Sequence, residues 1–331
     1  MTGAAQTAAA RASELCDAAL AGDRLALARL LTAVENRTPV AESALRRLYP
    51  LAGRAHLVGI TGPPGSGKST LVSALIAAAR GAGRAVGVIA VDPSSPITGG
   101  ALLGDRVRMQ AYAADSDVFI RSMASRGHAG GLASTSAAAA SVLDAAGFDL
   151  ILLETVGTGQ SEVEVAASAD TTVVLEAPEM GDEVQAIKAG LLEVADIVVV
   201  NKGDRPGAQR TAAQLRAMLT ASARVGQGTV DKPRPKQPHV LVTTALSGDG
   251  VPELLAAIDG LRGAATASTA ARTSRAEAQV WAILADRLRA ELSKPGLRAA
   301  AQATLAQVAA HELDPFTAAD RLLEELARAR S

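Results

Sequence analysis

Nine consecutive residues combine glycines, a lysine and hydroxyl groups in an order suited to binding phosphate. They match the pattern G-x-x-x-x-G-K-[ST] and read Gly62-Pro63-Pro64-Gly65-Ser66-Gly67-Lys68-Ser69-Thr70. Glycines allow backbone N–H groups to turn inward around a phosphate, and a helix N-terminus adds unpaired N–H donors. We expect Lys68 to reach the β- and γ-phosphates of a nucleotide and the Ser69 hydroxyl to bind Mg²⁺.

The segments on either side of this phosphate loop give it the context that the motif requires. Residues 56–61 form an apolar run typical of a short buried strand, and residues 71–76 have the composition of a helix start. A chance glycine-rich turn between a strand and a helix is the alternative explanation. Because motif and context coincide, the sequence favours nucleotide binding.

A second motif, Asn201-Lys202-Gly203-Asp204, follows another apolar run and matches the guanine-reading pattern N-K-x-D. The Asp204 carboxylate can accept hydrogen bonds from guanine N1–H and the exocyclic amine together, whereas adenine offers no such pair of donors. Binding of the wrong base would leave this buried carboxylate without a hydrogen-bond partner. The resulting penalty can reject that base by roughly 10⁴-fold. We therefore expect GTP rather than ATP. Asn201 is expected to tie this loop to the phosphate loop, and Lys202 to lie along the base.

Backbone N–H groups after the last apolar run offer a further contact to the base. Residues 239–243 predict a strand, and it is followed by Thr244, Ala245 and Leu246. We expect N–H groups of these three residues to reach guanine O6.

Three carboxylates are candidates for holding Mg²⁺ and its waters. Asp92 ends the apolar run 85–91, and Glu154 follows the run 148–153. Carboxyl ends of parallel strands form the ligand edge of such a sheet. Asp105 lies in the glycine-rich segment 98–108, where Thr98 is a competing metal ligand. A turn-forming role for Asp92 before a proline is the alternative at that position.

The segment that starts at Glu154 occupies the place where many nucleotide hydrolases carry D-x-x-G. Glu154 is then the acid that orients Mg²⁺ through water, and the Gly157 N–H senses the γ-phosphate. Gln160 or Glu162 is a candidate for orienting the attacking water, although the usual glutamine is not evident. The catalytic candidates are thus Lys68, Asp105, Glu154 and Gly157, and we expect slow hydrolysis by the isolated protein.

The order of apolar runs and helical segments predicts an α/β fold. We expect a P-loop NTPase with a mostly parallel central sheet flanked by helices. Residues 1–50 are expected to form an N-terminal helical extension, 51–262 the GTPase domain and 263–331 a C-terminal helical dimerisation arm. In that arm Val280, Leu284, Leu288 and Leu292 recur at helical spacing.

Composition narrows the partners and the compartment. Across 331 residues the net charge is −1 and aromatic residues make up 2%, which argues against nucleic acid as a partner. We see no apolar run of membrane-spanning length and no signal peptide, so no membrane association is expected. Cys16 is the only cysteine. A reducing, cytoplasmic location is the expectation.

Four strings together resemble one family, the methylmalonyl-CoA mutase-associated GTPases, also called MeaB or ArgK-type proteins. The strings are GPPGSGKST, VDPSSPITGGALLGDRVRM, ETVGTGQSE and NKGD, and the resemblance covers about residues 10–331. It implies a GTPase that acts as a chaperone for the adenosylcobalamin-dependent mutase, gating cofactor loading and protecting the mutase from inactivation. It also implies a homodimer built through the C-terminal helices, and nucleotide-responsive loops around residues 98–108, 154–164 and 177–188.

Two other functions fit the residues less well. An older transport label in the same family suggests an ATPase or kinase tied to arginine and ornithine uptake, but the guanine-reading motif argues against ATP. Metal delivery, known for related GTPases, requires clustered His or Cys residues. The four histidines are scattered and Cys16 stands alone, so metal delivery is unsupported.

Overall fold

The computed structural model describes residues 3–92, 112, 114–124, 131–155, 168–178, 194–225, 238–267 and 269–329. It divides into two compact units, Met1–Arg272 and Thr273–Ser331. Asp105 and Gly157 lie outside the described residues, as do Thr98, Gln160 and Glu162. Of Asp92 only the backbone position is described, as the last residue of a strand.

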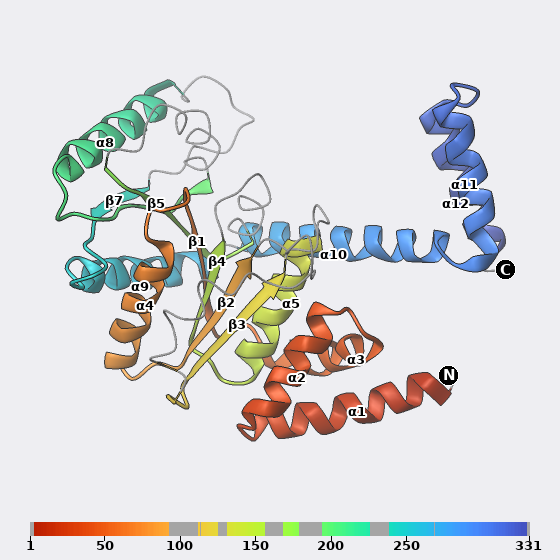
Figure 1. Ribbon diagram of the computed structural model, residues 1–331, viewed down its shortest axis with the longest axis horizontal. Coiled ribbons are helices and arrows are strands. Elements are labelled where there is room, and N and C mark those ends of the chain that lie inside the picture. The colour runs from red at the N-terminus through yellow and green to blue at the C-terminus, as the bar shows by residue number, and fades with distance from the viewer. Residues whose placement is uncertain are drawn as a thin grey trace. The chain divides into compact units, whose positions relative to one another are not determined.

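A seven-stranded sheet in the order β3-β2-β4-β1-β5-β6-β7 forms the centre of the first unit (Figure 1). All neighbouring strands are parallel. This arrangement confirms the α/β fold with a parallel central sheet. The strands are β1 (His56–Thr61), β2 (Val86–Asp92), β3 (Val118–Ala124), β4 (Leu150–Thr155), β5 (Thr171–Glu176), β6 (Ile197–Val200) and β7 (His239–Val242).

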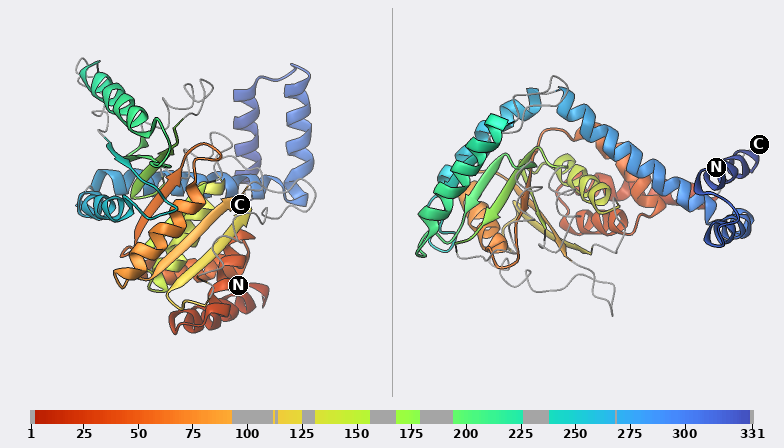
Figure 2. Two further views of the ribbon diagram at one scale, coloured as in Figure 1. Left: turned by 60° about the vertical axis from the view of Figure 1, so that its left-hand side comes forward. Right: turned by 90° about the horizontal axis from the view of Figure 1, so that it is seen from above.

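Helices cover both faces of the sheet (Figures 1 and 2), and the central strands β4, β5 and β6 are buried along their whole length. Alternate residues of one strand point to opposite faces. On β4, Leu150 and Leu152 join a core with α4 (Lys68–Gly81) and α9 (Val251–Ala267). Ile151 and Leu153 of the same strand join the core on the opposite face, with α5 (Gly131–Ala145). The β6 side of that second face is covered by α8 (Ala208–Val225).

Three helices precede the sheet and share the core that contains α5. They are α1 (Gly3–Leu20), α2 (Arg24–Glu35) and α3 (Pro39–Leu48), followed by the short 3₁₀ helix η1 (Tyr49–Leu51). Asp23 caps α2 by accepting from the N–H groups of Leu25 and Ala26. Leu30 and Leu31 are fully buried against this core, so these helices cover the sheet on the β2–β4 side.

Aspartates immediately before three strands hold neighbouring strands at the amino edge of the sheet. Asp149 accepts from the Ala85 N–H at 2.9 Å. Asp170 accepts from the Leu57 N–H at 3.0 Å, and Asp196 from the Thr172 N–H at 2.8 Å. These contacts satisfy backbone donors where the strands begin.

The second unit holds most of α10 (Thr269–Leu292), together with α11 (Pro295–Ala309) and α12 (Pro315–Arg328). Among its described residues, Ala301, Thr304 and Ala318 are the buried ones. Large apolar side chains are exposed on all three helices, namely Val280, Trp281, Ile283, Leu284, Leu305, Phe316 and Leu323. The second unit therefore buries little apolar surface within itself.

Candidate nucleotide-binding site

The phosphate loop connects β1 to α4, as its sequence context predicts. Gly62 has φ of 145° and Gly67 has φ of 95°, both in the region that side chains rarely adopt. A Cβ at Gly62 would overlap the carbonyl oxygen of Leu175 on β5, and one at Gly67 would overlap the Asn201 amide nitrogen. Both glycines are therefore required by conformation and by close packing.

The Lys68 ammonium lies inside the turn of this loop. Its Nζ donates to the carbonyl oxygens of Gly62 at 2.7 Å and Pro63 at 3.1 Å. The residue is buried, so its charge is held by backbone oxygens rather than by bulk water. This is the position from which a lysine can meet phosphate oxygens placed in the loop.

A hydroxyl and a carboxylate meet beside the loop. Ser69, on the first turn of α4, donates through Oγ to Glu154 Oε1 at 2.6 Å. Glu154 is near the carboxyl end of β4, and both residues are buried. Hard oxygen donors of this kind suit Mg²⁺. Asp92 ends the adjacent strand β2, in which Ala90 pairs with Glu154.

Asn201 joins the loop after β6 to two other loops. Its Nδ2 donates to the Ser66 carbonyl at 2.9 Å. Its Oδ1 accepts from Thr243 Oγ1 at 3.2 Å and from the Ala245 N–H at 3.1 Å. The side chain is almost fully buried. The expected link between base-reading loop and phosphate loop is thus present, and it extends to the loop after β7.

Lys202 forms a second link to the phosphate loop. Its backbone adopts φ of 58°, and its Nζ donates to the Gly65 carbonyl at 2.6 Å. The next residue, Gly203, donates its N–H to the Thr243 carbonyl at 2.9 Å. The aliphatic chain of Lys202 is therefore fixed at both ends.

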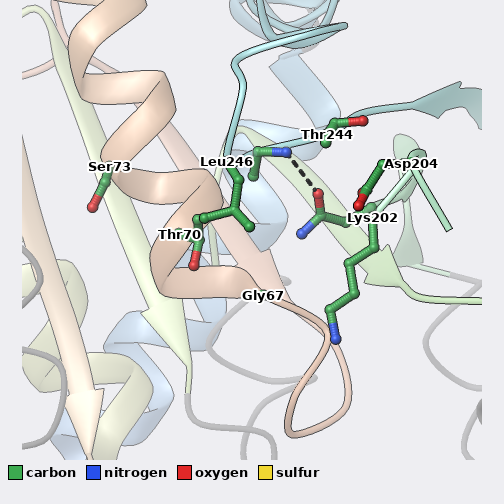
Figure 3. Close-up of a pocket in the computed structure, with 9 residues that line it drawn as sticks. Gly67, Thr70, Ser73, Lys202, Asp204, Thr244 and Leu246 are labelled. Carbon is green, nitrogen blue, oxygen red and sulfur yellow. Dashed lines mark hydrogen bonds between the residues drawn. The ribbon is translucent and has the colours of Figure 1, made fainter.

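A pocket of ≈ 530 Å³ lies between the phosphate loop, α4 and the two loops that follow β6 and β7 (Figure 3). Lys202 and Asp204 lie on one side of it, while Thr70 and Leu246 lie on the other. Its lining is formed by Gly67, Thr70, Ser73, Asn201, Lys202, Asp204, Thr244, Ala245 and Leu246. Residues predicted from three separate motifs thus surround one space of the size of a nucleotide-binding cleft.

Two features of the pocket go beyond what the motifs indicate. Ser73 lines it although no motif predicts this residue, and the available signal is its helical spacing of three from Thr70. The Ala245 N–H, expected to reach guanine O6, donates to Asn201 in this structure. If the Ala245 N–H also contacts guanine O6, this one donor must be shared between O6 and Asn201 Oδ1.

One histidine at the amino edge of the sheet has a shifted pKa. His56 begins β1, is buried and has its Nε2 at 2.8 Å from Thr171 Oγ1. Burial disfavours the charged imidazolium and lowers the pKa of His56. This histidine lies five residues along β1 from Thr61, at the end that faces away from the phosphate loop.

The parallel sheet, the glycine-rich loop and the N-K-x-D loop define the class as a P-loop GTPase. A family model described as "Methylmalonyl Co-A mutase-associated GTPase MeaB" matches residues 27–296. The chain belongs to this family, and it is a GTP hydrolase whose substrate is GTP.

Two relatives and one solved structure illustrate the similarity. A GTPase-family protein of Pyrococcus abyssi is 45% identical over 318 residues, covering 95% of this chain and 96% of the relative. The mouse protein named "Methylmalonic aciduria type A homolog, mitochondrial" is 32% identical, covering 92% and 76%. A crystal structure described as that of a LAO/AO transport system kinase is 31% identical, with a TM-score of 0.66 and coverage of 96% and 98%. Among the described residues, no helix is both long enough and apolar enough to cross a membrane.

Proposed function

We propose that the chain hydrolyses GTP to signal to methylmalonyl-CoA mutase, gating the loading of adenosylcobalamin and protecting the mutase. The observation that carries this proposal is the mutase-associated family model, which extends over residues 27–296 and so includes both loops that meet in the pocket. A switch of this kind requires a guanine nucleotide site that is joined to neighbouring loops. Asn201 and Lys202 supply the joining contacts to the phosphate loop.

The residues around the pocket have separate roles in the proposed reaction. Lys68 neutralises charge on the β- and γ-phosphates, and the loop N–H groups hold those phosphates in line with the attacking water. Asp204, on the pocket wall, accepts from the guanine edge. Because Asn201 fixes the relative position of three loops, binding of the base helps to set the geometry in which the phosphates are held.

Ser69 and Glu154 are the described residues that would hold Mg²⁺, because their buried oxygens already lie 2.6 Å apart. Mg²⁺ there would neutralise charge developing on the phosphate oxygens. Asp92 and Asp105 remain proposed contributors, as Gly157 remains the proposed sensor of the γ-phosphate. Glu154, in the place of the more common aspartate, accepts directly from Ser69 Oγ at 2.6 Å.

The decisive experiment measures GTP turnover by the full chain with and without purified methylmalonyl-CoA mutase. We expect slow turnover alone and stimulation by the mutase; supplying a missing catalytic group is worth about 10³–10⁵-fold in other GTPases. A different adenosylcobalamin-dependent enzyme at the same concentration is the specificity control. A rate that the mutase does not change would contradict the proposed switch while leaving GTP hydrolysis intact.

The transport-linked alternative has one specific observation behind it, the similarity to a structure described as that of a LAO/AO transport system kinase. That proposal requires an ATPase or kinase. Competition binding tests it directly, since Asp204 predicts that GTP displaces a labelled guanine nucleotide and ATP does not. Equal displacement by ATP would favour the transport-linked function.

We also propose that residues 263–331 form a dimerisation arm. Val280 and Trp281 are 62% and 60% exposed on α10, and Phe316 is 85% exposed on α12. Apolar surface of this extent is typical of an interaction face. Light scattering should give the mass of a dimer for the natural chain and of a monomer for Trp281→Glu. A monomer for the natural chain at all concentrations would contradict the arm.

A further inference from the structure

His56 is a buried histidine with one ring nitrogen that lacks a partner. It is the first residue of β1 and is 1% exposed. Its Nε2 lies 2.8 Å from Thr171 Oγ1, whereas Nδ1 is buried and has no hydrogen-bond partner among the described residues. A neutral imidazole carries one N–H, which Thr171 can accept, but an imidazolium carries two. Proton uptake therefore creates a buried donor at Nδ1 that the surrounding described residues do not satisfy.

The helix nearest to His56 is α9. Alternate side chains of a strand share one face of the sheet, so His56 lies on the same face as Val58 and Ile60. These two residues belong to the core that α4 and α9 form together, and the two helices lie side by side on that face (Figure 1). Asp259 and Arg262, both on α9, act electrostatically on His56. The C-terminal half of α9 therefore lies close to the histidine.

The two halves of α9 are held to the sheet by different amounts of apolar contact. The second half, residues 259–267, adds the partly buried Leu261 to the core. The first half adds four buried apolar side chains, those of Val251, Leu254, Leu255 and Ile258. Because burial of apolar surface is the main source of stability, the first half is held more firmly.

Two polar contacts at the amino edge hold the second half. Asp259 accepts from Arg84 at 2.7 and 2.8 Å, with the arginine 16% and the aspartate 44% exposed. Arg262 Nη2 donates to the Arg54 carbonyl at 2.5 Å. Partly exposed polar contacts of this kind contribute little to stability. We therefore expect the second half of α9 to open at a lower free energy than the first half.

The surroundings of His56 favour its neutral form. Burial disfavours the imidazolium and is the largest influence that lowers the pKa of His56. The neighbouring charges oppose one another, because two carboxylates favour the imidazolium and two arginines disfavour it. Both carboxylates already accept other hydrogen bonds. The charged groups around His56 are Asp170 before β5, Asp259 and Arg262 on α9, Arg84 before β2, and Asp149 before β4, whose carbonyl accepts from the His56 N–H.

We propose that proton uptake by His56 releases residues 259–267 of α9 from the amino edge of the sheet, so that this half of the helix is a pH-sensitive latch. Release admits water to the imidazolium, which then finds the acceptors that the closed form lacks. Residues 263–267 also begin the proposed dimerisation arm, so the latch controls whether the start of that segment is held. The latch goes beyond the proposed signalling to the mutase and does not depend on it.

The size of the effect follows from the linkage between opening and proton binding. In the open form the pKa of His56 returns to about 6.5. If the closed form stays neutral, the equilibrium constant for opening rises about tenfold from pH 7.5 to pH 5.5. The effect is small above pH 7 and grows as the pH falls below 6.5.

Hydrogen exchange of the full chain, measured by mass spectrometry at pH 7.5 and 5.5 and corrected for intrinsic rates, tests the latch. We expect residues 259–267 of the natural chain to lose protection about tenfold at pH 5.5, while residues 251–258 change little. His56→Gln cannot become charged, and its residues 259–267 should keep equal protection at both pH values. His56→Asn, a second uncharged variant, should behave in the same way. His239→Gln, at an exposed histidine, is the control and should behave like the natural chain.

Three results would overturn the latch. The first is equal protection of residues 259–267 at both pH values in the natural chain. The second is a loss at pH 5.5 that persists in both uncharged variants of His56. The third is a loss spread evenly over β1, β5 and the whole of α9, because His56 would then act on the fold rather than on one half of a helix. None of these results bears on GTP hydrolysis, which is measured separately.

Discussion

The two edges of the central sheet both gather polar side chains, but they hold them in different ways. Around the amino edge, arginines pair with partly exposed carboxylates: Arg80 with Asp115 and Asp117, and Arg84 with both oxygens of Asp259. At the carboxyl edge the polar groups that connect the loops include buried side chains. There Lys68 and Asn201 bind backbone carbonyls of a loop.

This difference predicts that substitutions at the two edges will have effects of different size. Exposed ion pairs contribute little to stability and tolerate loss, because water replaces the missing partner. Buried side chains that bind loop backbones cannot be removed so easily, because they leave unsatisfied groups behind. The carboxyl edge is therefore where single substitutions should have large and specific consequences.

Substitution of Lys68 should have the largest effect. Lys68→Ala removes the charge that lies in the phosphate loop, and we expect kcat for GTP hydrolysis to fall by about 10³-fold. Single-turnover hydrolysis measures this, with Lys294→Ala as the control because that lysine pairs at the surface with Glu291. Turnover near that of the natural chain would remove Lys68 from its proposed role.

Asp204 should control which base is accepted. Asp204→Asn replaces the carboxylate that accepts from two guanine donors, and we expect the preference for GTP over xanthosine triphosphate to fall by about 10²-fold. Competition binding with both nucleotides measures this ratio, with Glu253→Gln on α9 as the control. An unchanged ratio would count against the assignment of Asp204.

Substitutions of Asn201 and of Arg84 compare the contributions of the two edges to stability. Asn201→Ala removes three side-chain hydrogen bonds from a buried position, and we expect the free energy of unfolding to fall by about 2 kcal/mol. Arg84→Ala removes a bidentate pair with Asp259 in which the arginine is 16% and the aspartate 44% exposed, and it should cost about 1 kcal/mol. Denaturant titration measures both. Equal losses would remove the distinction between the edges.

The smallest expected effect is a dependence of folding stability on pH that arises from His56 at the amino edge. Burial lowers the pKa of His56 in the folded state, with Asp170, Asp259, Arg84 and Arg262 as the neighbouring charges. The unfolded state therefore binds the proton more readily. The contribution of neutral His56 is complete above its unfolded pKa of about 6.5 and is lost as the pH falls from there through the lower folded pKa.

We expect His56→Gln, which cannot become charged, to lose less stability than the natural chain between about pH 7.5 and 5.5, by roughly 1 kcal/mol. Melting temperatures at both pH values measure this. His239→Gln, at an exposed histidine that begins β7, is the control. Parallel pH profiles for His56→Gln and the natural chain would show that His56 does not contribute.

Much of the fold follows from patterns that are local in the sequence. Each of these strands is a short apolar run, and the runs 56–61 and 239–243 coincide with β1 and β7 apart from one residue at the end of β7. Ser73 escapes prediction, because an ordinary helical serine carries no motif that distinguishes a pocket wall from a surface. The motifs predict a role for the Leu246 N–H, but they give no signal for its exposed side chain.

The sequence by itself determined that a glycine-rich loop and a guanine-reading loop would follow buried strands, because both motifs depend on residue types at short fixed spacings. Only the tertiary structure decided how the loops meet. Asn201 reaches Ser66 across 135 positions of chain, and the Ala245 N–H turns to Asn201 rather than toward the base. Such contacts depend on strand order and on packing distances across the sheet, which no local pattern encodes.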